Sequence, residues 1–409
     1  MPLHYMQYMS SGLEKNKGEK RMSIFVYLAE LVHAQLEGRK PTEVPQGIVI
    51  EEIIDIAHRN HMEYLLLGAL LKTDKLSEEH KGLMRGKVMQ SLMRTMAQVT
   101  ELKELESCFE AAGVKNQPMK GARMKFIYPA PEMREMSDID VLIDGDCMKK
   151  ATEILAEKGY GLVRSVKHHD IYRKAPFVVV EAHKAMYDKT VDEEQYKYFS
   201  NFSRAVLREG MNYTYDFSPE DFYVYMMAHM AKHFYTMGCG IRNLVDVYVY
   251  REKYGKTMNA EYVKEELKKC GILEFTKHME KLADIWLKGE KNSPFYDDLF
   301  QYMVDSGIYG KDENGIWNKF SEEKMKDKDA TPSQLKRWYY FPPLSYMAEY
   351  YPWLETHHWL LPVAWGIRAW RGIFMKKGEK KRKMVHEIEA DKVKTYQTIY
   401  QNMELHFKK

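Results

Sequence analysis

The chain has 409 residues, with 62 Lys or Arg against 59 Asp or Glu, so its formal net charge is only +3. A chain of this length has room for two or three domains with sizeable cores. A general binder of nucleic acids is usually much more basic, so the composition does not favour nucleic acid as a partner.

The sequence predicts a cytoplasmic protein. No apolar segment with a cleavage site follows the positive charges near the N-terminus, so we expect no signal peptide. No apolar run approaches the length of a membrane span, and we expect no transmembrane segment. The cysteines are far apart, as is typical of free thiols in a reducing compartment: Cys108, Cys147, Cys239 and Cys270.

Residues 22–112 are predicted to form a helical N-terminal domain. Apolar residues recur at three- and four-residue spacing over residues 23–36 and 48–72, which is typical of helices with one buried face. Residues 78–112 extend this region as one or two long helices, and Gly113 is the expected terminator.

Residues 113–210 are predicted to form a small α+β core, a mixed sheet with flanking helices. Short β-rich runs bounded by turn residues indicate strands, and longer runs indicate helices. The expected strands are 114–119, 139–143, 162–165, 171–174 and 177–183, and the expected helices are 122–128 and 147–158. We expect His168 and His169 to lie in a solvated turn.

The rest of the chain is predicted to be mainly helical. A helical domain over residues 218–290 begins at Ser218-Pro219-Glu220-Asp221. A hydroxyl N-cap, a proline at the first position and acids in the first turn all favour a helix start there. Residues 291–409 form a Pro- and Trp-rich region with a basic run at 376–383 and a charged helix from residue 387 onward.

Aromatic and cationic residues are mixed in the segment 359–374, where Trp365 and Trp370 lie near Arg368 and Arg371. A segment of this kind can lie on a membrane surface or bind an anionic partner. Tryptophans in a helix more often pack on their own domain. We therefore favour that packing and treat peripheral membrane contact as the less favoured alternative.

The most informative feature is the run that begins with Asp138-Ile139-Asp140-Val141. Side chains alternate along a strand, so the two aspartates point to one face and the apolar residues to the other. Neighbouring carboxylates repel each other unless a cation lies between them. Such pairs also occur on solvated strand edges, but this pair opens a strongly apolar strand, where carboxylates need partners. We therefore predict a site for a hard divalent metal with oxygen ligands.

Two other segments can complete this site. In the turn at Lys120-Gly121, glycine lets the backbone approach a ligand closely, and the opening N–H groups of the next helix would face an anion. The alternative is an ordinary strand-to-helix turn. A second β-rich run ends in Glu181 and His183. We favour a metal role for Glu181 over pairing with His183 or Arg173, and we expect His183 to support the ligands from behind.

His229 and His233 lie four residues apart and share one helical face, a spacing that can bind zinc. Met230 stands where the HExxH motif of metalloproteases has its glutamate, so a metalloprotease is not expected. A pair of this kind can also pack between helices, with a hydrogen bond to Asp246 or Tyr248.

Together these residues resemble the nucleotidyltransferase superfamily with the DNA-polymerase-beta-like fold, and most closely a bacterial family of uncharacterised nucleotidyltransferases. That family has a Lys-Gly turn, then Arg-x-x-Ser-Asp-x-Asp, a strand ending in acid-x-His, and a helix with spaced histidines followed by Asp. The resemblance covers about residues 50–250. The matching positions are Met119–Gly121, Arg134–Asp140, Val180–His183, His229, His233 and Asp246.

The resemblance implies an α+β nucleotidyltransferase fold enclosed by mainly α-helical N- and C-terminal regions. It also implies Mg²⁺-dependent transfer of a nucleoside monophosphate from a nucleoside triphosphate, expected to be ATP, to an acceptor hydroxyl with release of pyrophosphate. Asp138, Asp140 and Glu181 would hold one or two Mg²⁺ ions, with Mn²⁺ as an alternative, and Glu181 would also take the acceptor proton.

Further roles follow from the same resemblance. Ser137, with Lys120 and Gly121, would contact the phosphates. Arg134 would either neutralise charge on the pyrophosphate or tie down its loop through an acid such as Glu132. The residues expected behind the ligands or on the acceptor side are His183, His229, His233 and Asp246. The Lys-Gly turn departs from the Gly-Ser or Gly-Gly of better characterised relatives.

The acceptor is not specified by these motifs; a small molecule or a protein hydroxyl ranks above RNA. Two other classes of function stay open. One is a catalytically weak nucleotide-binding or regulatory protein, given the altered glycine turn. The other is an interaction protein that acts through its helical C-terminal region.

Overall fold

The computed structural model describes residues 15–166, 168–187, 193–200, 202–311, 314, 337, 340–374 and 390–405. Its centre is a five-stranded mixed sheet with the strand order β1-β2-β5-β4-β3. The neighbours β2 and β5 run parallel, and the other neighbouring pairs run antiparallel. The strands are β1 (Asn116–Pro118), β2 (Ile139–Ile143), β3 (Gly161–Ser165), β4 (His169–Lys174) and β5 (Val178–His183). The expected α+β class with a mixed sheet is confirmed.

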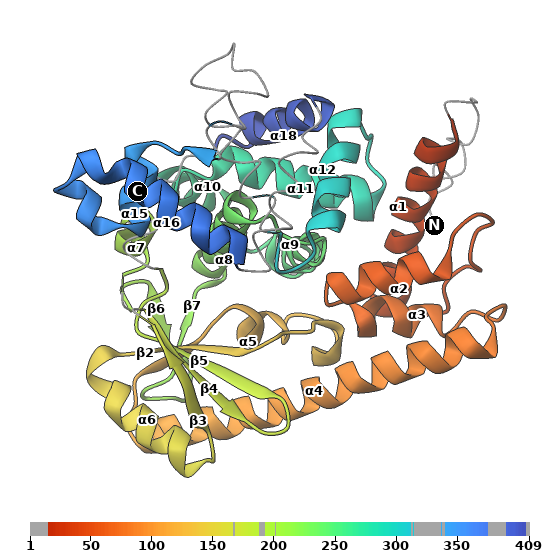
Figure 1. Cartoon of the computed structure of the whole chain (residues 1–409). Coiled ribbons are helices and arrows are strands. Elements are labelled where there is room, and N and C mark those ends of the chain that lie inside the picture. The colour runs from red at the N-terminus through yellow and green to blue at the C-terminus, as the bar shows by residue number, and fades with distance from the viewer. Residues whose placement is uncertain are drawn as a thin grey trace.

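One face of the sheet packs against two helices, α4 (Glu78–Ala111) and α6 (Met148–Glu157), which lie below it in Figure 1. Ile139 and Val141 of β2 and Val180 of β5 belong to this core. Side chains at alternate positions point to the opposite face, where Leu142 joins a second and larger core with the helical regions. The period-two pattern of β2 therefore separates an apolar face from the face that carries the aspartates.

The larger core joins the N-terminal helices to the helices that follow the sheet. Trp286 donates its indole N–H to the carbonyl oxygen of Phe25, across 261 positions of sequence. The elements of these two regions are α1 (Lys15–Leu36), α2 (Ile50–Arg59), η2 (Glu63–Leu67), α3 (Gly68–Leu70), α8 (Pro219–Thr236), α9 (Arg242–Tyr254), α10 (Ala260–Lys269), α11 (Leu273–Lys288) and α12 (Pro294–Ser306).

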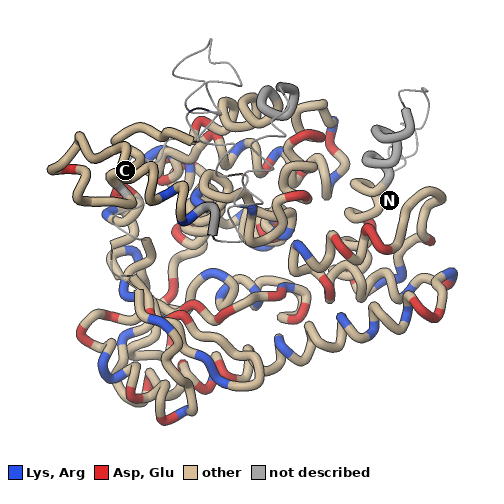
Figure 2. The backbone as a smooth tube through the Cα atoms, in the orientation of Figure 1, with Lys and Arg blue, Asp and Glu red and all other residues tan. Residues whose placement is uncertain are grey.

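Several short elements connect these parts. They are α5 (Lys120–Met124), η3 (Pro131–Met133), η4 (Gly145–Cys147), α7 (Glu193–Tyr198), β6 (Ala205–Leu207) and β7 (Tyr215–Phe217). Acidic and basic residues are interspersed over the described backbone, in keeping with the small net charge (Figure 2). The four cysteines are free thiols.

The N-terminal helices differ from expectation at one point. The helix predicted over residues 48–72 ends at Arg59, and the chain reverses through His61, which has a φ of 50°. A π-helix then follows in place of a regular helix. In contrast, α4 is one unbroken helix, and Gly113 ends it with a φ of 69° that glycine adopts at little cost.

The C-terminal region contains α15 (Leu344–Tyr350), η5 (Pro352–Glu355), η6 (His358–Leu360), α16 (Leu361–Phe374) and α18 (Ala390–Met403). Trp365 packs inward and donates to the carbonyl oxygen of Pro342 at 2.9 Å. Trp359 and Trp370 are 76% and 63% exposed, so the preferred inward packing is wrong for these two. The basic run 376–383 lies outside the described residues. Among the described helices, none is both long and apolar enough to cross a bilayer.

We predict that Ser218→Ala lowers the free energy of unfolding by about 1 kcal/mol, because Ser218 accepts a hydrogen bond from the backbone N–H of Asp221 at 3.1 Å and so caps α8. Urea unfolding measures the change. The matched control is Ser293→Ala, since Ser293 also precedes a helix-starting proline but makes no side-chain cap hydrogen bond. Equal losses in both variants would contradict the capping role.

Candidate functional site

The three acidic residues singled out in the sequence come together on one face of the sheet. Asp140 of β2 lies directly opposite Glu181 of β5 in the parallel register. Asp138 precedes Asp140 by two residues, just before β2 begins. Asp140 is almost completely buried, whereas Asp138 and Glu181 are half-buried. The group therefore has a buried base and a rim that solvent can reach.

Asp140 is the most strongly held of the three acids. The Lys120 ammonium donates to Asp140 Oδ1 at 2.6 Å, and His183 Nε2 lies 2.8 Å from the same oxygen. A carboxylate can only accept, so His183 Nε2 carries the hydrogen in this contact. Burial opposes ionisation, but the Lys120 charge and the His183 bond outweigh it and lower the pKa of Asp140. Asp140 is thus an anion in the folded protein.

The pKa values of Asp138 and Glu181 are shifted in opposite directions. Burial, followed by the negative charges of Asp140 and Glu181, raises the pKa of Asp138 to about 7. For Glu181, burial opposes ionisation, but the hydrogen bond from His183 lowers its pKa. Each carboxylate affects the others, so the three acids form one electrostatic unit.

His169 also belongs to this group, and the expectation that it is solvated in a turn is wrong. It is the first residue of β4, opposite His183 in the antiparallel register. Its Nε2 lies 3.8 Å from Glu181 Oε1, and the rings of His169 and His183 are 4.9 Å apart. A start of this strand two residues earlier than predicted brings the imidazole onto the face of the acids.

The Lys-Gly turn places the ammonium of Lys120. Lys120 opens α5 with a φ of 46°, in the left-handed region that few residues other than glycine adopt. At Gly121, a Cβ atom would lie 2.9 Å from Met136 Cβ and 3.1 Å from Arg134 Nη1. The glycine is therefore required for the close approach of α5 to the loop before β2. That packing holds Lys120 beside Asp140.

Arg134 pairs with an acid outside this group, and its predicted contact with phosphate stays a prediction. Its side chain is buried and makes two hydrogen bonds to Asp246 of α9, at 3.1 and 2.8 Å. Tyr128 donates to the same carboxylate at 2.8 Å. Arg134 thus fixes its loop, as in the second alternative, but its partner is Asp246 and not Glu132. The role of Asp246 here is to hold that loop.

We predict that Arg134→Met lowers the free energy of unfolding by about 3–5 kcal/mol, because it leaves the buried Asp246 carboxylate without its cation. Urea unfolding at neutral pH provides the measurement. Lys197→Ala removes an exposed i,i+4 pair with Glu193 and should change stability by less than about 1 kcal/mol. If Arg134→Met lowers the free energy of unfolding no more than Lys197→Ala does, the Arg134–Asp246 pair is not what fixes the loop.

His229 and His233 of α8 contact each other and not Asp246 or Tyr248. Their Nε2 atoms are 3.2 Å apart. Burial, followed by the charges of Lys120 and Lys232, lowers the pKa of His233 to about 4, and burial also lowers that of His229. Both rings are thus neutral at pH 7. The effect of Lys120 on both shows that α8 faces the acid group.

We predict that acid lowers the free energy of unfolding by protonating the His229–His233 pair of α8. His233 has a lower pKa in the folded chain than its ordinary value of 6.5, so the unfolded chain binds the extra proton first. The stabilisation is present above pH 6.5 and is lost as the pH falls towards 4. Between pH 7 and pH 5, wild type should lose roughly 1–2 kcal/mol more than His233→Gln in urea unfolding. Parallel pH dependences in the two proteins would refute this assignment.

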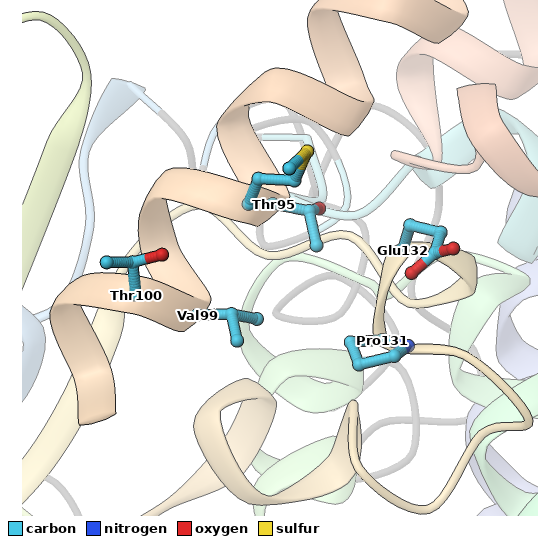
Figure 3. A pocket seen from close by; sticks show the side chains of 6 residues that line it. Thr95, Val99, Thr100, Pro131 and Glu132 are labelled. Atoms are coloured by element: carbon cyan, nitrogen blue, oxygen red, sulfur yellow. The ribbon is translucent and has the colours of Figure 1, made fainter.

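Two further features are the predicted residue Ser137, which directly precedes Asp138, and a pocket. Ser137 Oγ is 2.6 Å from the hydroxyl of Tyr309, so it is tied to the segment after α12. An open pocket of about 190 Å³ lies between α4 and the start of η3 (Figure 3). Its walls come from Met96, Val99 and Pro131 among others, and none of the acid group lines it. We do not assign the chemistry to this pocket.

The donor set fits a hard divalent cation. Asp138, Asp140 and Glu181 offer carboxylate oxygens from two neighbouring strands, which are the ligands that Mg²⁺ prefers. The Lys120 ammonium, 2.6 Å from Asp140 Oδ1, shows that the group accommodates a positive charge at its base.

Comparisons with known proteins identify the family of the chain. The family described as "Uncharacterised nucleotidyltransferase" matches residues 46–288. A crystal structure of an antigenic nucleotidyltransferase-like protein from Paracoccidioides brasiliensis is 15% identical, with a TM-score of 0.30; the match covers 49% of this chain and 94% of that one. No functionally curated protein matches the sequence.

Proposed function

Because the chain belongs to the uncharacterised nucleotidyltransferase family, we propose that it transfers a nucleoside monophosphate from a nucleoside triphosphate to an acceptor hydroxyl. ATP is the proposed donor. The observation that supports this most directly is the register of β2 and β5, which brings Asp140 opposite Glu181 with Lys120 alongside. Three carboxylates and one ammonium are what a metal-bound triphosphate needs for recognition.

In this proposal Asp138, Asp140 and Glu181 hold Mg²⁺, with Mn²⁺ as the alternative ion. When bound, the metal stabilises the charge on the attacking and leaving oxygens of an in-line displacement. The acceptor oxygen forms a bond to the α-phosphorus, the bond from that phosphorus to the bridging oxygen breaks, and pyrophosphate leaves. Glu181 takes the acceptor proton, because its carboxylate lies on the accessible rim of the group.

The remaining residues bind or position. Lys120 offers its ammonium to the phosphates, and Gly121 and Ser137 lie on the segments that flank it. His183 orients Asp140 through the 2.8 Å contact. Arg134 acts at a distance, by fixing the loop that leads into Asp138.

For the acceptor we propose a small molecule or a protein side chain and not RNA, because the net charge is close to neutral. The free cysteines favour a cytoplasmic location for this reaction.

We predict that Asp138→Asn and Glu181→Gln each lower pyrophosphate release by a factor on the order of 10² or more, since each removes a charge from the metal ligands. The assay follows pyrophosphate and label transfer from each labelled nucleoside triphosphate with Mg²⁺ and candidate acceptors. Asp144→Asn, just beyond the end of β2 and paired with Lys115, is the matched control and should keep full activity.

Two results would contradict the proposal. Full turnover by Asp138→Asn would show that the acids are not the catalytic group. Binding of Mg-ATP by wild type, with no pyrophosphate released for any acceptor, would favour the nucleotide-binding regulatory protein. Thermal unfolding of each variant checks that lost activity does not come from lost folding.

A further inference from the structure

Beyond the magnesium chemistry, we propose that His169, Glu181 and His183 form a binding site for a transition-metal ion, with Zn²⁺ as its favoured occupant. Two imidazoles flank one carboxylate. The three residues come from the neighbouring strands β4 and β5 and share one face of the sheet. One ligand atom from each lies within 4.8 Å of the others.

The distances suit zinc. With ligands at about 2.0–2.2 Å in a tetrahedron, neighbouring ligand atoms are about 3.3–3.6 Å apart. His183 Nε2 is 3.3 Å from Glu181 Oε2, and His169 Nε2 is 3.8 Å from Glu181 Oε1. These two contacts end on different oxygens of Glu181, so side-chain shifts within the 4.8 Å that encloses the three ligand atoms are needed to reach ligand spacing. Two histidines, one glutamate and an open fourth position form a known type of zinc site.

Hydrogen bonds among these three side chains explain their arrangement less well than a shared metal ion does. An imidazole Nε2 carries a single hydrogen, and His183 Nε2 lies 2.8 Å from Asp140 Oδ1 and 3.3 Å from Glu181 Oε2, so Glu181 has only the longer of the two contacts. The 3.8 Å between His169 and Glu181 is too long for a hydrogen bond. The group is thus a cluster of potential ligands whose contacts with one another are long.

Metal binding at Nε2 changes the tautomer of the imidazole rings. A metal on Nε2 requires the proton to move to Nδ1. The Nδ1 atoms of His169 and His183 are buried and have no hydrogen-bond partner among the described residues. At His183 the move also breaks the Nε2–H bond to Asp140 Oδ1, and Lys120 remains as the partner of that oxygen.

The chemistry of the donors separates this site from the proposed magnesium site. Imidazole nitrogen favours Zn²⁺ over Mg²⁺, whereas carboxylates alone favour Mg²⁺. The two sites share Glu181, so a bound Zn²⁺ ion withdraws that residue from the magnesium ligands and blocks nucleotidyl transfer. The metal binding stands without the proposed function; only the inhibition rests on it.

The test measures Zn²⁺ affinity of the full-length chain, without a histidine tag, by competition with a chromophoric chelator and no nucleotide present. Wild type should bind Zn²⁺ at least roughly tenfold more tightly than His169→Ala. His169 is chosen because it lies at the strand end, whereas loss of His183 would also disturb Asp140. His80→Ala, which removes a histidine paired with Glu51 far from the sheet, should bind like wild type.

Co²⁺ absorption provides a second readout, because a four-coordinate site gives an intense visible band that His169→Ala should lose. Equal Zn²⁺ affinity of wild type and His169→Ala would overturn the proposal. The proposal would also be overturned if His233→Ala lost Zn²⁺ binding while His169→Ala kept it, since the ion would then belong to the histidine pair of α8. Asp138→Asn should keep the Co²⁺ band even though it lacks pyrophosphate release, which separates this proposal from the proposed function.

Discussion

The ionised side chain of Asp140 is the constraint on which the rest of the site depends. A buried carboxylate without a partner is strongly unfavourable, so the fold must bring compensating groups to it. It does so from two directions: Lys120 comes from the turn after β1, and His183 comes from the neighbouring strand β5. Since both contacts end on one oxygen, the second oxygen of Asp140 is left for other interactions.

A second buried charge pair holds this arrangement in place from behind. Arg134 and Asp246 join the loop before β2 to α9, and Arg242 donates to the carbonyl oxygen of Glu135 in the same loop. Tyr64 reaches Glu135 from the N-terminal helices. The loop that leads into the aspartates is therefore anchored by elements from both helical regions, which gives the helices a direct part in shaping the site.

The sequence predicted what depends on local pattern. The alternation in β2 and β5 correctly assigned the faces of Asp140 and Glu181, and the cap at Ser218 correctly began α8. Contacts between distant segments were not predictable in this way, because a sequence does not say which acid an arginine will meet. Arg134 pairs with Asp246, 112 residues away, and not with the nearby Glu132.

The same limit explains the other differences. His169 looked like a turn residue because its strand begins with polar side chains, and only the pairing with β5 reveals its position. The helix break at His61 has no proline or glycine to announce it. Trp370 is exposed, although the composition of its segment favoured inward packing. The hydrophobic cluster beneath α16 instead contains Trp365, which lies on the other side of that helix.

The 34 residues of α4 form a rod of about 50 Å. Met84, near one end, sits in the core of the N-terminal helices, while Leu105 and Phe109, near the other, lie under the sheet. A tilt of the N-terminal helices would consequently move the strands as well, because the same rigid helix packs in both cores. A hinge between the N-terminal helices and the sheet would have to break this continuous helix.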